Sequence, residues 1–283
     1  MKLEDKIALW VDLGKNTKYS EIYELQKKLA LIRRSESIPD IILQVQHQRE
    51  VNFGSKEEYN LFDQDFLKGI GDVYNKEPGE KEILQTLQEL DIHFSKTNRG
   101  GGATVVAPGQ MIYYPIVDVE KVTGKPYNPL DMTSVGAYKK MLDNIMYDVL
   151  KSFEVPDIFI ADGKNPHTGR DRRDVWYQEK GNPISYKIGS KGIKISKGIA
   201  YHGFVLYMYE QGIENFGIVR PCGYDHNVVS VTSVEKVKEI IPETEVHKKV
   251  KEIVHKKFGY EDIHDVSKNE FYNMLKVLEY SAH

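Results

Sequence analysis

Cys222 is the only cysteine in this chain of 283 residues, and it lies between Pro221 and Gly223. A thiolate forms and breaks thioesters readily, so a cysteine with a proton-accepting partner is sufficient for acyl transfer. Free cysteines are also among the most buried residues, where they act as small hydrophobic side chains. Cys222 is therefore a candidate nucleophile, and the residues upstream of it decide between the two interpretations.

Lys187 is the candidate base. It follows the weakly charged residues Ile-Ser-Tyr in a segment that alternates like a pair of strands. Burial of a lysine lowers its pKa from about 10.4 and lets the amine accept protons. We expect Lys191, Lys194 and Lys197, further along the same segment, to be ordinary lysines on a solvated face.

Two histidines are candidates for orienting a substrate. His202 directly precedes Gly203, and His47 lies in a predicted strand. A histidine in such a place either contacts the substrate or is a hydrogen-bonded residue of the core. The residues alone leave both interpretations open.

A glycine-rich run, RGGGATVVAPGQ, occupies residues 99–110. Glycine permits backbone torsions and close approaches that a side chain would forbid. Such a loop can line a tunnel for a thin ligand or present amides to an anion, and it can equally be a plain turn. It lacks the Gly-Lys-Ser/Thr ending of a phosphate loop and does not read GxGxxG.

The composition is that of an ordinary soluble globular protein, with 40% hydrophobic and 29% charged residues. The net charge of −3 gives no electrostatic argument for a nucleic-acid partner. No apolar run approaches the roughly 18 residues of a membrane span, and the first ten residues lack a signal-peptide core. One cysteine excludes an internal disulfide, so we expect a cytoplasmic protein.

Hydrophobic residues recur at helical spacing in several segments, and β-branched or aromatic residues dominate others. The predicted helices are 19–34, 80–90, 134–153, 243–257 and 268–280. The predicted strands are 41–54, two runs within 103–119 that form a hairpin or a bent pair, 175–177, 184–188, 192–195, 199–206 and 216–219. Residues 69–79 are expected to form a polar surface insertion, and 161–174 a charged loop. Without regular strand–helix alternation, this order indicates an α+β fold with a mixed central sheet flanked by helices.

The order of these motifs resembles the lipoate-biosynthesis octanoyltransferases of the LipB type. The pattern RGG-x-x-T-x-x-x-PGQ begins at Arg99, and Lys-Ile-x-x-x-Gly-Ile-x-Ile begins at Lys187 with His-Gly downstream. Pro-Cys-Gly around Cys222 is followed by Val-Thr-Ser-Val at 231–234. The resemblance covers roughly residues 7–235.

The resemblance implies the fold of biotin and lipoate protein ligases and the transfer of an octanoyl group from octanoyl-acyl carrier protein. The acceptors would be lysines of lipoyl domains, in 2-oxoacid dehydrogenase E2 subunits or the glycine cleavage H protein. Cys222 would be the nucleophile and Lys187 the catalytic base. The implied substrate-binding residues are Arg99, Gly100, Gly101, Gly102, Ala103, Thr104, Val106, Gly109, His47, Gly189, Ser190, His202 and Gly203. The acyl group arrives as an activated thioester, so no ATP, metal or other cofactor is expected.

The chain departs from the family pattern in its glycine-rich motif, which commonly reads RGGQVTYHGPGQ. Gly102 stands where glutamine is usual, and Val106 and Ala107 stand where His-Gly is usual. The expected organisation is a catalytic domain over 1–235 and a C-terminal helical extension over 236–283. Two other interpretations stay open: an ATP-dependent lipoate or biotin protein ligase, and a non-catalytic binding protein on the same fold.

Overall fold

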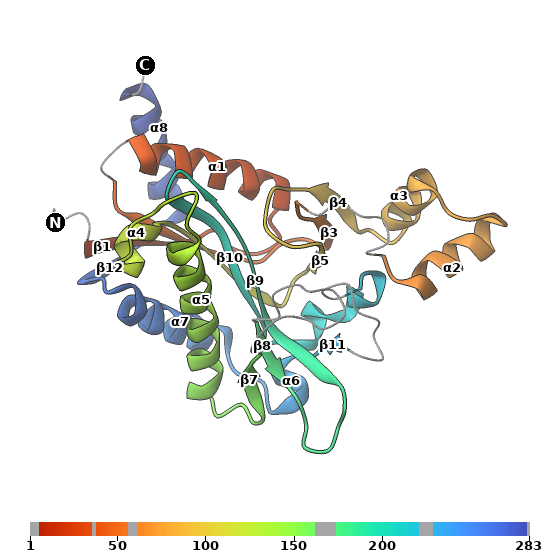
Figure 1. Cartoon of the computed structure of the whole chain (residues 1–283). Helices are drawn as coiled ribbons and strands as arrows, with labels where there is room; N and C mark the ends of the chain where they lie inside the picture. The colour runs from red at the N-terminus through yellow and green to blue at the C-terminus, as the bar shows by residue number, and fades with distance from the viewer. Residues whose placement is uncertain (1–5, 36–37, 56–61, 162–173, 221–228, 282–283) are drawn as a thin grey trace.

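The computed structural model describes residues 6–35, 38–55, 62–161, 174–220 and 229–281 (Figure 1). Its strands are β1 (Ile7–Asp12), β2 (Asp40–Val45), β3 (Glu50–Phe53), β4 (His93–Lys96), β5 (Ala103–Val106), β6 (Gln110–Asp118), β7 (Ile158–Ile160), β8 (Val175–Tyr177), β9 (Ser185–Ser196), β10 (Ile199–Tyr207), β11 (Val229–Val231) and β12 (Asp262–Val266). Its helices are α1 (Tyr19–Ser35), α2 (Gln64–Tyr74), α3 (Glu80–Glu89), α4 (Val119–Thr123), α5 (Thr133–Ser152), η3 (Glu210–Gly212), η4 (Glu214–Ile218), α6 (Val234–Val237), α7 (Glu243–Phe258) and α8 (Lys268–Ser281).

Within these residues a nine-stranded mixed sheet forms the centre of the fold. Its strand order is β12-β1-β2-β6-β10-β9-β8-β7, with β11 paired to β9. The pairs of β1 with β2 and β12 are parallel, whereas β2-β6, β6-β10, β10-β9 and β9-β8 are antiparallel. The α+β prediction is therefore confirmed.

Helices cover both faces of this sheet (Figure 1). The long helix α5 and helix α7 pack on one face, where Tyr138, Leu142 and Val250 belong to the same hydrophobic cluster as Tyr113 of β6. Helices α1 and α8 pack on the other face with a second cluster. The apolar stripes of the four helices explain these positions, because each stripe must be removed from water.

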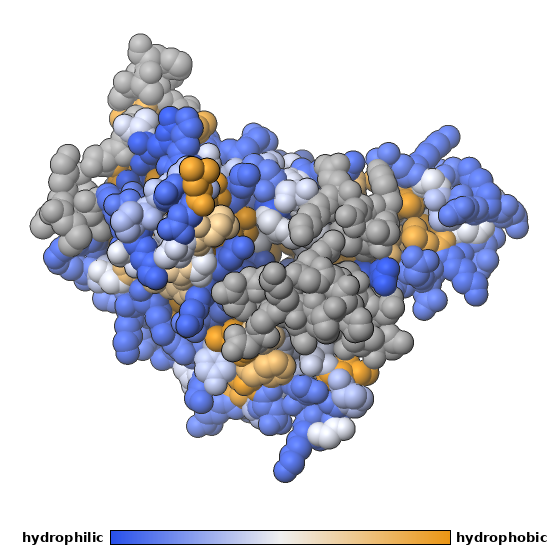
Figure 2. All heavy atoms as spheres, viewed as in Figure 1, coloured by the Kyte–Doolittle hydropathy of each residue, from blue (hydrophilic) through white to orange (hydrophobic). Residues whose placement is uncertain are grey.

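A second sheet of three strands, in the order β4-β3-β5, lies beside the first. Its core includes Val51, Phe53, Val105, Ile70 and side chains of α3 and η4. Helices α2 and α3 project from this sheet as an arm. On the face shown in Figure 2 the arm is mostly hydrophilic, with hydrophobic side chains where it joins the body.

The structure corrects four details of the sequence prediction. The segment 69–79 begins as helix, because α2 is capped by Asp63 and buries Ile70. The predicted strand 216–219 is mostly the 3₁₀ helix η4. The predicted strand 41–54 is split between the two sheets as β2 and β3, and the two runs within 103–119 are likewise divided as β5 and β6. The predicted strands 184–188 and 192–195 are parts of one strand, β9.

The C-terminal segment contains both predicted helices, as α7 and α8, and also a strand that the sequence did not indicate. This strand, β12, pairs in parallel with β1, with Ile7 opposite Asp262. Side chains of α7 such as Val246 and Val254 lie in the hydrophobic cluster of α5 and the central sheet. Residues beyond 235 thus complete the central sheet and its core.

Candidate active site

A cavity of about 430 Å³ lies where the central sheet meets the small sheet. This volume is typical of small-molecule sites, which span about 300–1,000 Å³. Its walls come from the glycine-rich run, the strands β5, β6, β9 and β10, helix η4 and the residue before β8. The residues that line it are Tyr19, Ser55, Arg99, Gly100, Gly101, Gly102, Ala103, Thr104, Val105, Val106, Gln110, Ile112, Tyr114, Lys139, Asp174, Lys187, Ser190, Lys191, Gly192, Ile193, His202, Gly203, Phe204, Val205, Tyr207 and Phe216.

Most residues predicted to bind substrate come together around this cavity. The lining includes Lys187, Ser190, the pair His202 and Gly203, and the glycine-rich run from Arg99 to Thr104 together with Val106. His47, Gly109 and Gly189 are described by the structure but do not line it. Cys222 lies outside the described residues.

Lys187 is buried in strand β9, and its ammonium group forms an ion pair with Asp174. The distance from Lys187 Nζ to Asp174 Oδ2 is 2.6 Å. The same nitrogen lies 5.2 Å from the centre of the Trp176 ring, within the range of a cation–π contact. A carboxylate and an aromatic face both stabilise the charged form of a lysine.

Lys191 is not the solvated lysine that the sequence suggested. Its side chain is only 8% exposed, and Nζ lies 2.5 Å from Asp143 Oδ1 and 3.3 Å from Asp174 Oδ1. Burial alone would lower the pKa of Lys191, but the charges of Asp174 and Asp143 raise it above the usual lysine value. The sequence did contain a signal for this position. Side chains four residues apart on a strand lie on the same face, so a buried Lys187 predicts that Lys191 faces the same side of the sheet.

Arg99 fixes the glycine-rich run from inside the protein. Its Nη2 donates to the carbonyl oxygens of Asn52, at 2.6 Å, and Gly102, at 2.7 Å, while Nη1 reaches Gly100 O at 3.4 Å. Burial lowers the pKa of Arg99, yet an arginine stays protonated at every physiological pH. The arginine therefore holds the loop in shape as well as contributing a positive wall to the cavity.

A chain of hydrogen bonds connects Arg99 to a buried carboxylate. Arg99 Nε donates to Asn52 Oδ1 at 2.7 Å, Asn52 Nδ2 donates to Ser95 Oγ at 2.7 Å, and Ser95 Oγ donates to Glu50 Oε1. Burial raises the pKa of Glu50, and the Ser95 hydroxyl opposes this shift. These hydrogen bonds connect β3, β4 and the glycine-rich run beneath the cavity.

His202 lies in the wall of the cavity in a backbone conformation that is unusual for a strand. Its φ is +58°, and its N–H donates to Gln26 Oε1 at 2.7 Å instead of to a strand neighbour. Its ring stacks on Tyr23, and Nε2 lies 3.2 Å from Asn98 Oδ1. Burial and the charge of Arg99 lower the pKa of His202 to about 3, so the ring is neutral at pH 7.

Gly203, the next residue, is required by a close backbone approach. A Cβ built at this position would lie 2.1 Å from the carbonyl oxygen of Tyr113 and 2.7 Å from Pro115 Cδ. No side chain fits there without moving strand β6. The close approach of β10 to its neighbour β6 therefore explains why a glycine follows the histidine in the His-Gly motif.

His47 lies behind the cavity wall. Its Nε2 is 2.8 Å from the hydroxyl of Tyr114 and its Nδ1 is 2.9 Å from Thr17 Oγ1. Its ring packs against Tyr19 at 4.9 Å between centres, and both Tyr19 and Tyr114 line the cavity. Burial lowers the pKa of His47 to about 3. His47 therefore supports two wall residues from outside the cavity.

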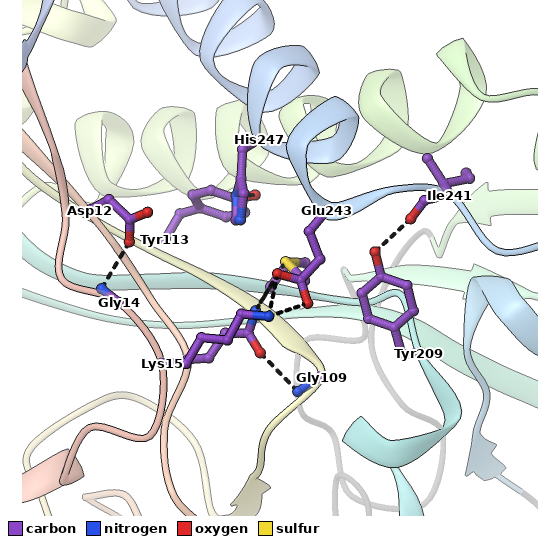
Figure 3. A network of polar contacts seen from close by, with 11 residues as sticks. Asp12, Gly14, Lys15, Gly109, Tyr113, Tyr209, Ile241, Glu243 and His247 are labelled. Atoms are coloured by element: carbon purple, nitrogen blue, oxygen red, sulfur yellow. Dashed lines mark hydrogen bonds and ion pairs between the residues drawn. The ribbon is translucent and has the colours of Figure 1, made fainter.

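Gly109 faces away from the cavity, into the polar network of Figure 3. Its N–H donates to Gln46 Oε1 at 3.0 Å, and Gln46 Nε2 donates to Glu243 at 3.1 Å. Glu243, in the first turn of α7, also pairs with Lys15 at 2.8 Å. The glycine-rich run is thereby joined to the C-terminal segment. Sequence reasoning missed Gln46 and Glu243 because neither belongs to a motif.

Gly189 belongs to the pairing of β9 with β10 and β8. A Cβ at this position would lie 3.2 Å from Met146 Sδ, so the residue packs closely beneath helix α5. The sequence placed it in the substrate site, and the structure places it in the contact between sheet and helix.

A family model described as "Lipoyl protein ligase A/B catalytic domain" matches residues 18–259, which is most of the chain. The chain belongs to this family. The match extends beyond residue 235 and includes α7, in agreement with the shared core of that helix.

Curated relatives are similar over nearly the whole chain. An octanoyltransferase from Dictyoglomus thermophilum is 26% identical over 264 residues, which are 90% of this chain and 90% of the relative. The mitochondrial octanoyltransferase LIP2 of Arabidopsis thaliana is 27% identical over 248 residues, 87% and 86% of the two chains. The family resemblance that the motifs indicated is therefore confirmed.

Solved structures show the same fold at low sequence identity. A putative lipoate protein ligase from Thermoplasma acidophilum aligns with a TM-score of 0.60 at 13% identity, covering 96% of this chain and 94% of the other. A lipoate-protein ligase A bound with ATP aligns with a TM-score of 0.55 at 13% identity, covering 96% and 93%. The expected ligase fold is confirmed.

No helix among the described residues combines the length and the apolar character that crossing a membrane requires. No group of three or more His, Cys, Asp or Glu side chains within the same ranges is arranged to hold a metal ion.

Proposed function

We propose that this protein is an octanoyltransferase, which moves an octanoyl group from octanoyl-acyl carrier protein to a lysine of a lipoyl domain. One observation carries the proposal: the motif residues from Arg99 to Thr104, Lys187 and His202 surround a single cavity. The chain is an enzyme of the lipoyl ligase A/B family, and the relatives named octanoyltransferase favour this activity over a binding role.

The walls of the cavity suit an acyl chain. Val106, Ile112, Tyr114, Tyr207 and Phe216 contribute apolar or aromatic surface from β5, β6, β10 and η4. Polar groups are supplied by β9 and by the residue before β8. We propose that the hydrocarbon packs against the apolar surface while its carbonyl carbon lies toward Lys187. Val106, where the family commonly has histidine, makes the apolar wall larger.

We propose that Cys222 is the nucleophile and that Lys187 exchanges protons with it. Lys187 as a neutral amine takes the proton of the thiol, and the thiolate attacks the thioester carbonyl of the donor. The donor's carbon–sulfur bond breaks, a new bond forms to Cys222, and the ammonium of Lys187 returns its proton to the departing thiol. The neutral amine of the acceptor lysine then attacks the enzyme thioester and forms an amide. Lys187 takes the proton that this amine loses and passes it to Cys222, which leaves as the thiolate.

The proposed acceptor is a lipoyl domain. Support comes from the family and from a structural neighbour of Thermoplasma acidophilum described as a bipartite lipoate protein ligase with its E2 lipoyl domain. That neighbour aligns with a TM-score of 0.58 at 13% identity, covering 96% of this chain and 92% of the other. A lysine on a lipoyl domain is the nucleophile that the second half-reaction requires.

The proposal is tested by measuring the intact mass of the protein after incubation with octanoyl-acyl carrier protein. We expect an increase equal to one octanoyl group, located on Cys222 by peptide mapping and lost on addition of a lipoyl domain. The Cys222→Ser protein should carry no such adduct. A Cys222→Ser protein that acylates the lipoyl domain at the normal rate would remove Cys222 from the mechanism.

The same assay separates the transferase from an ATP-dependent ligase. One arm supplies octanoyl-acyl carrier protein without ATP, and a parallel arm supplies free octanoate with ATP and Mg²⁺. We expect octanoylated lipoyl domain only in the first arm. Product only in the second arm would assign the chain to the ligases, and product in neither would favour a binding protein.

A further inference from the structure

Four charged side chains form a continuous buried network that begins at Lys187 and ends on helix α5. Asp174 bonds Lys187 through Oδ2 at 2.6 Å and Lys191 through Oδ1 at 3.3 Å. Lys191 also pairs with Asp143 at 2.5 Å. The four side chains are between 1% and 11% exposed, so solvent screens these contacts very little.

The carboxylate of Asp174 is held in a fixed orientation. Besides the two ammonium groups, the backbone N–H of Lys191 donates to Oδ1 at 3.1 Å. Oδ1 therefore faces Lys191 with two donors while Oδ2 is directed at Lys187. A carboxylate held by this many donors has little freedom to rotate, so it defines where the ammonium of Lys187 lies.

Lys191 is bound more closely to Asp143 than to Asp174. The two distances are 2.5 Å and 3.3 Å, and Asp143 is fully buried on α5. Asp143 thus offsets part of the charge of Lys191, so Lys191 competes with Lys187 for Asp174 only weakly. An uncompensated ion in such a site would cost several kcal/mol, whereas the four charges sum to zero.

We propose that Asp174 is the positioning residue of Lys187, and that the Lys191–Asp143 pair holds Asp174 in place. This inference rests on the proposed function, in which Lys187 accepts and returns protons. Asp174 orients the amine, and it stabilises the ammonium each time Lys187 has taken a proton. The arrangement follows the general logic of a base that is oriented by a third group.

Among the described residues, the other charged side chains that line the cavity do not replace Asp174 in this role. Lys139 of α5 and Arg99 line the same cavity and are positive, so they act against the ammonium of Lys187. Trp176 stabilises that ammonium through its ring but accepts no proton. Among the ion pairs of the described residues, Asp174 is the carboxylate that contacts Lys187.

The proposal is tested by following the ammonium of Lys187 directly, with NMR of protein labelled with ¹⁵N-lysine and the signal assigned through Lys187→Arg. Asp174→Asn keeps the shape of the side chain but removes its charge. We expect Lys187 to lose its proton at a pH about 1–3 units lower than in the unmodified protein, because an adjacent opposite charge is worth that much. Asp174→Glu should restore part of the difference.

A second variant should shift the pH at which Lys187 loses its proton in the opposite direction. In the double variant Asp143→Asn with Lys191→Met the outer pair is replaced by neutral side chains, so the nearby positive charge of Lys191 no longer competes for Asp174. Lys187 should then lose its proton at higher pH. General damage to the fold would not raise the midpoint in one variant and lower it in the other. Lys194→Met, at an exposed position of the same strand, is the control and should change nothing.

Kinetics give the second readout. In steady-state transfer from octanoyl-acyl carrier protein, Asp174→Asn should lower kcat about 100-fold with little change in KM, as expected for a misplaced catalytic group. Unchanged titration of Lys187 in Asp174→Asn would overturn the inference even if the unmodified protein is an octanoyltransferase. If the unmodified protein transfers no octanoyl group, the proposed function fails, while the titration still reports whether Asp174 controls Lys187.

Discussion

Arg99 donates from Nε to the side-chain oxygen of Asn52 across 2.7 Å, and from Nη2 to the main-chain oxygen of the same residue. One arginine therefore ties strand β3 to the glycine-rich run at two points. The cavity wall that begins at Gly100 depends on this attachment. The geometry explains why an arginine precedes the three glycines, since only a planar group with several donors can bond these acceptors together.

Arg99→Met should destabilise the protein by about 2–4 kcal/mol, because it removes the Arg99 hydrogen bonds to the carbonyl groups of Asn52 and Gly102 and to the side-chain oxygen of Asn52. It should also abolish octanoyl transfer, since the run from Gly100 to Gly102 loses its anchor. Urea denaturation and the transfer assay measure the two effects. Arg34→Met, at an exposed arginine of α1, is the matched control and should change the free energy of unfolding by less than about 0.5 kcal/mol. Equal stability of the two variants would contradict the anchoring role.

Gly203→Ala should cost about 3 kcal/mol or more, because the new methyl group would overlap the Tyr113 carbonyl oxygen. The control is Gly136→Ala on helix α5, where a Cβ meets nothing within 4 Å. This control should stabilise the protein by about 0.5–1 kcal/mol, since alanine is the better helix former. Thermal unfolding of both variants gives the comparison, and a stable Gly203→Ala protein would show that β10 and β6 can separate.

The buried histidines make stability depend on pH. Burial holds the pKa of His47 and His202 at about 3 in the folded protein, below the value of about 6.5 expected when unfolded. Each histidine therefore contributes stability that is complete above pH 6.5 and is lost as the pH falls toward 3.

Between pH 7 and pH 5 each histidine should account for about 2 kcal/mol of lost stability. His202→Gln and His47→Gln should each reduce that loss by about this amount in urea denaturation at the two pH values. The same loss of stability in His202→Gln and in the unmodified protein would mean that the ring is charged when folded.

Gln46 should be the residue through which the C-terminal segment supports the glycine-rich run. Gln46→Leu leaves the N–H of Gly109 without its acceptor, at a cost of about 1–3 kcal/mol. Glu243→Gln should cost less than about 1 kcal/mol, since its partner Lys15 is 64% exposed. A double-mutant cycle on Gln46 and Glu243 should give a coupling of about 0.5–1.5 kcal/mol. Glu245→Gln in the same turn is the control, and zero coupling would contradict the network.

The spacing of hydrophobic residues in the sequence correctly predicted the helices that bury one continuous face. The helices α1, α5, α7 and α8 agree with the prediction to within one or two residues at each end, because each carries its own apolar stripe. The segment 216–219 was misassigned since Phe216 and Ile218 are spaced as in a strand, yet a 3₁₀ turn buries both. Helix α2 was partly missed because Gly69 and Gly71 resemble a turn, whereas packing of Ile70 stabilises helix.

The motifs predicted the lining of the cavity but not what supports it. Arg99 and Lys187 were found from motif spacing, and both line the cavity. Asp174, Asp143 and Gln46 come from segments without a motif, and only the pairing of strands and helices brings them to the site. Such long-range polar contacts leave no local pattern in a sequence, which is why the sequence suggested a solvated lysine where Lys191 is buried.

The parallel pairing of β1 with β12 has a consequence for biosynthesis. The ribosome makes β1 first and β12 only near the end of the described chain, so one edge of β1 has no neighbour during most of translation. An open strand edge invites pairing with other chains. The nascent protein is therefore prone to aggregation until β12 and α8 have emerged.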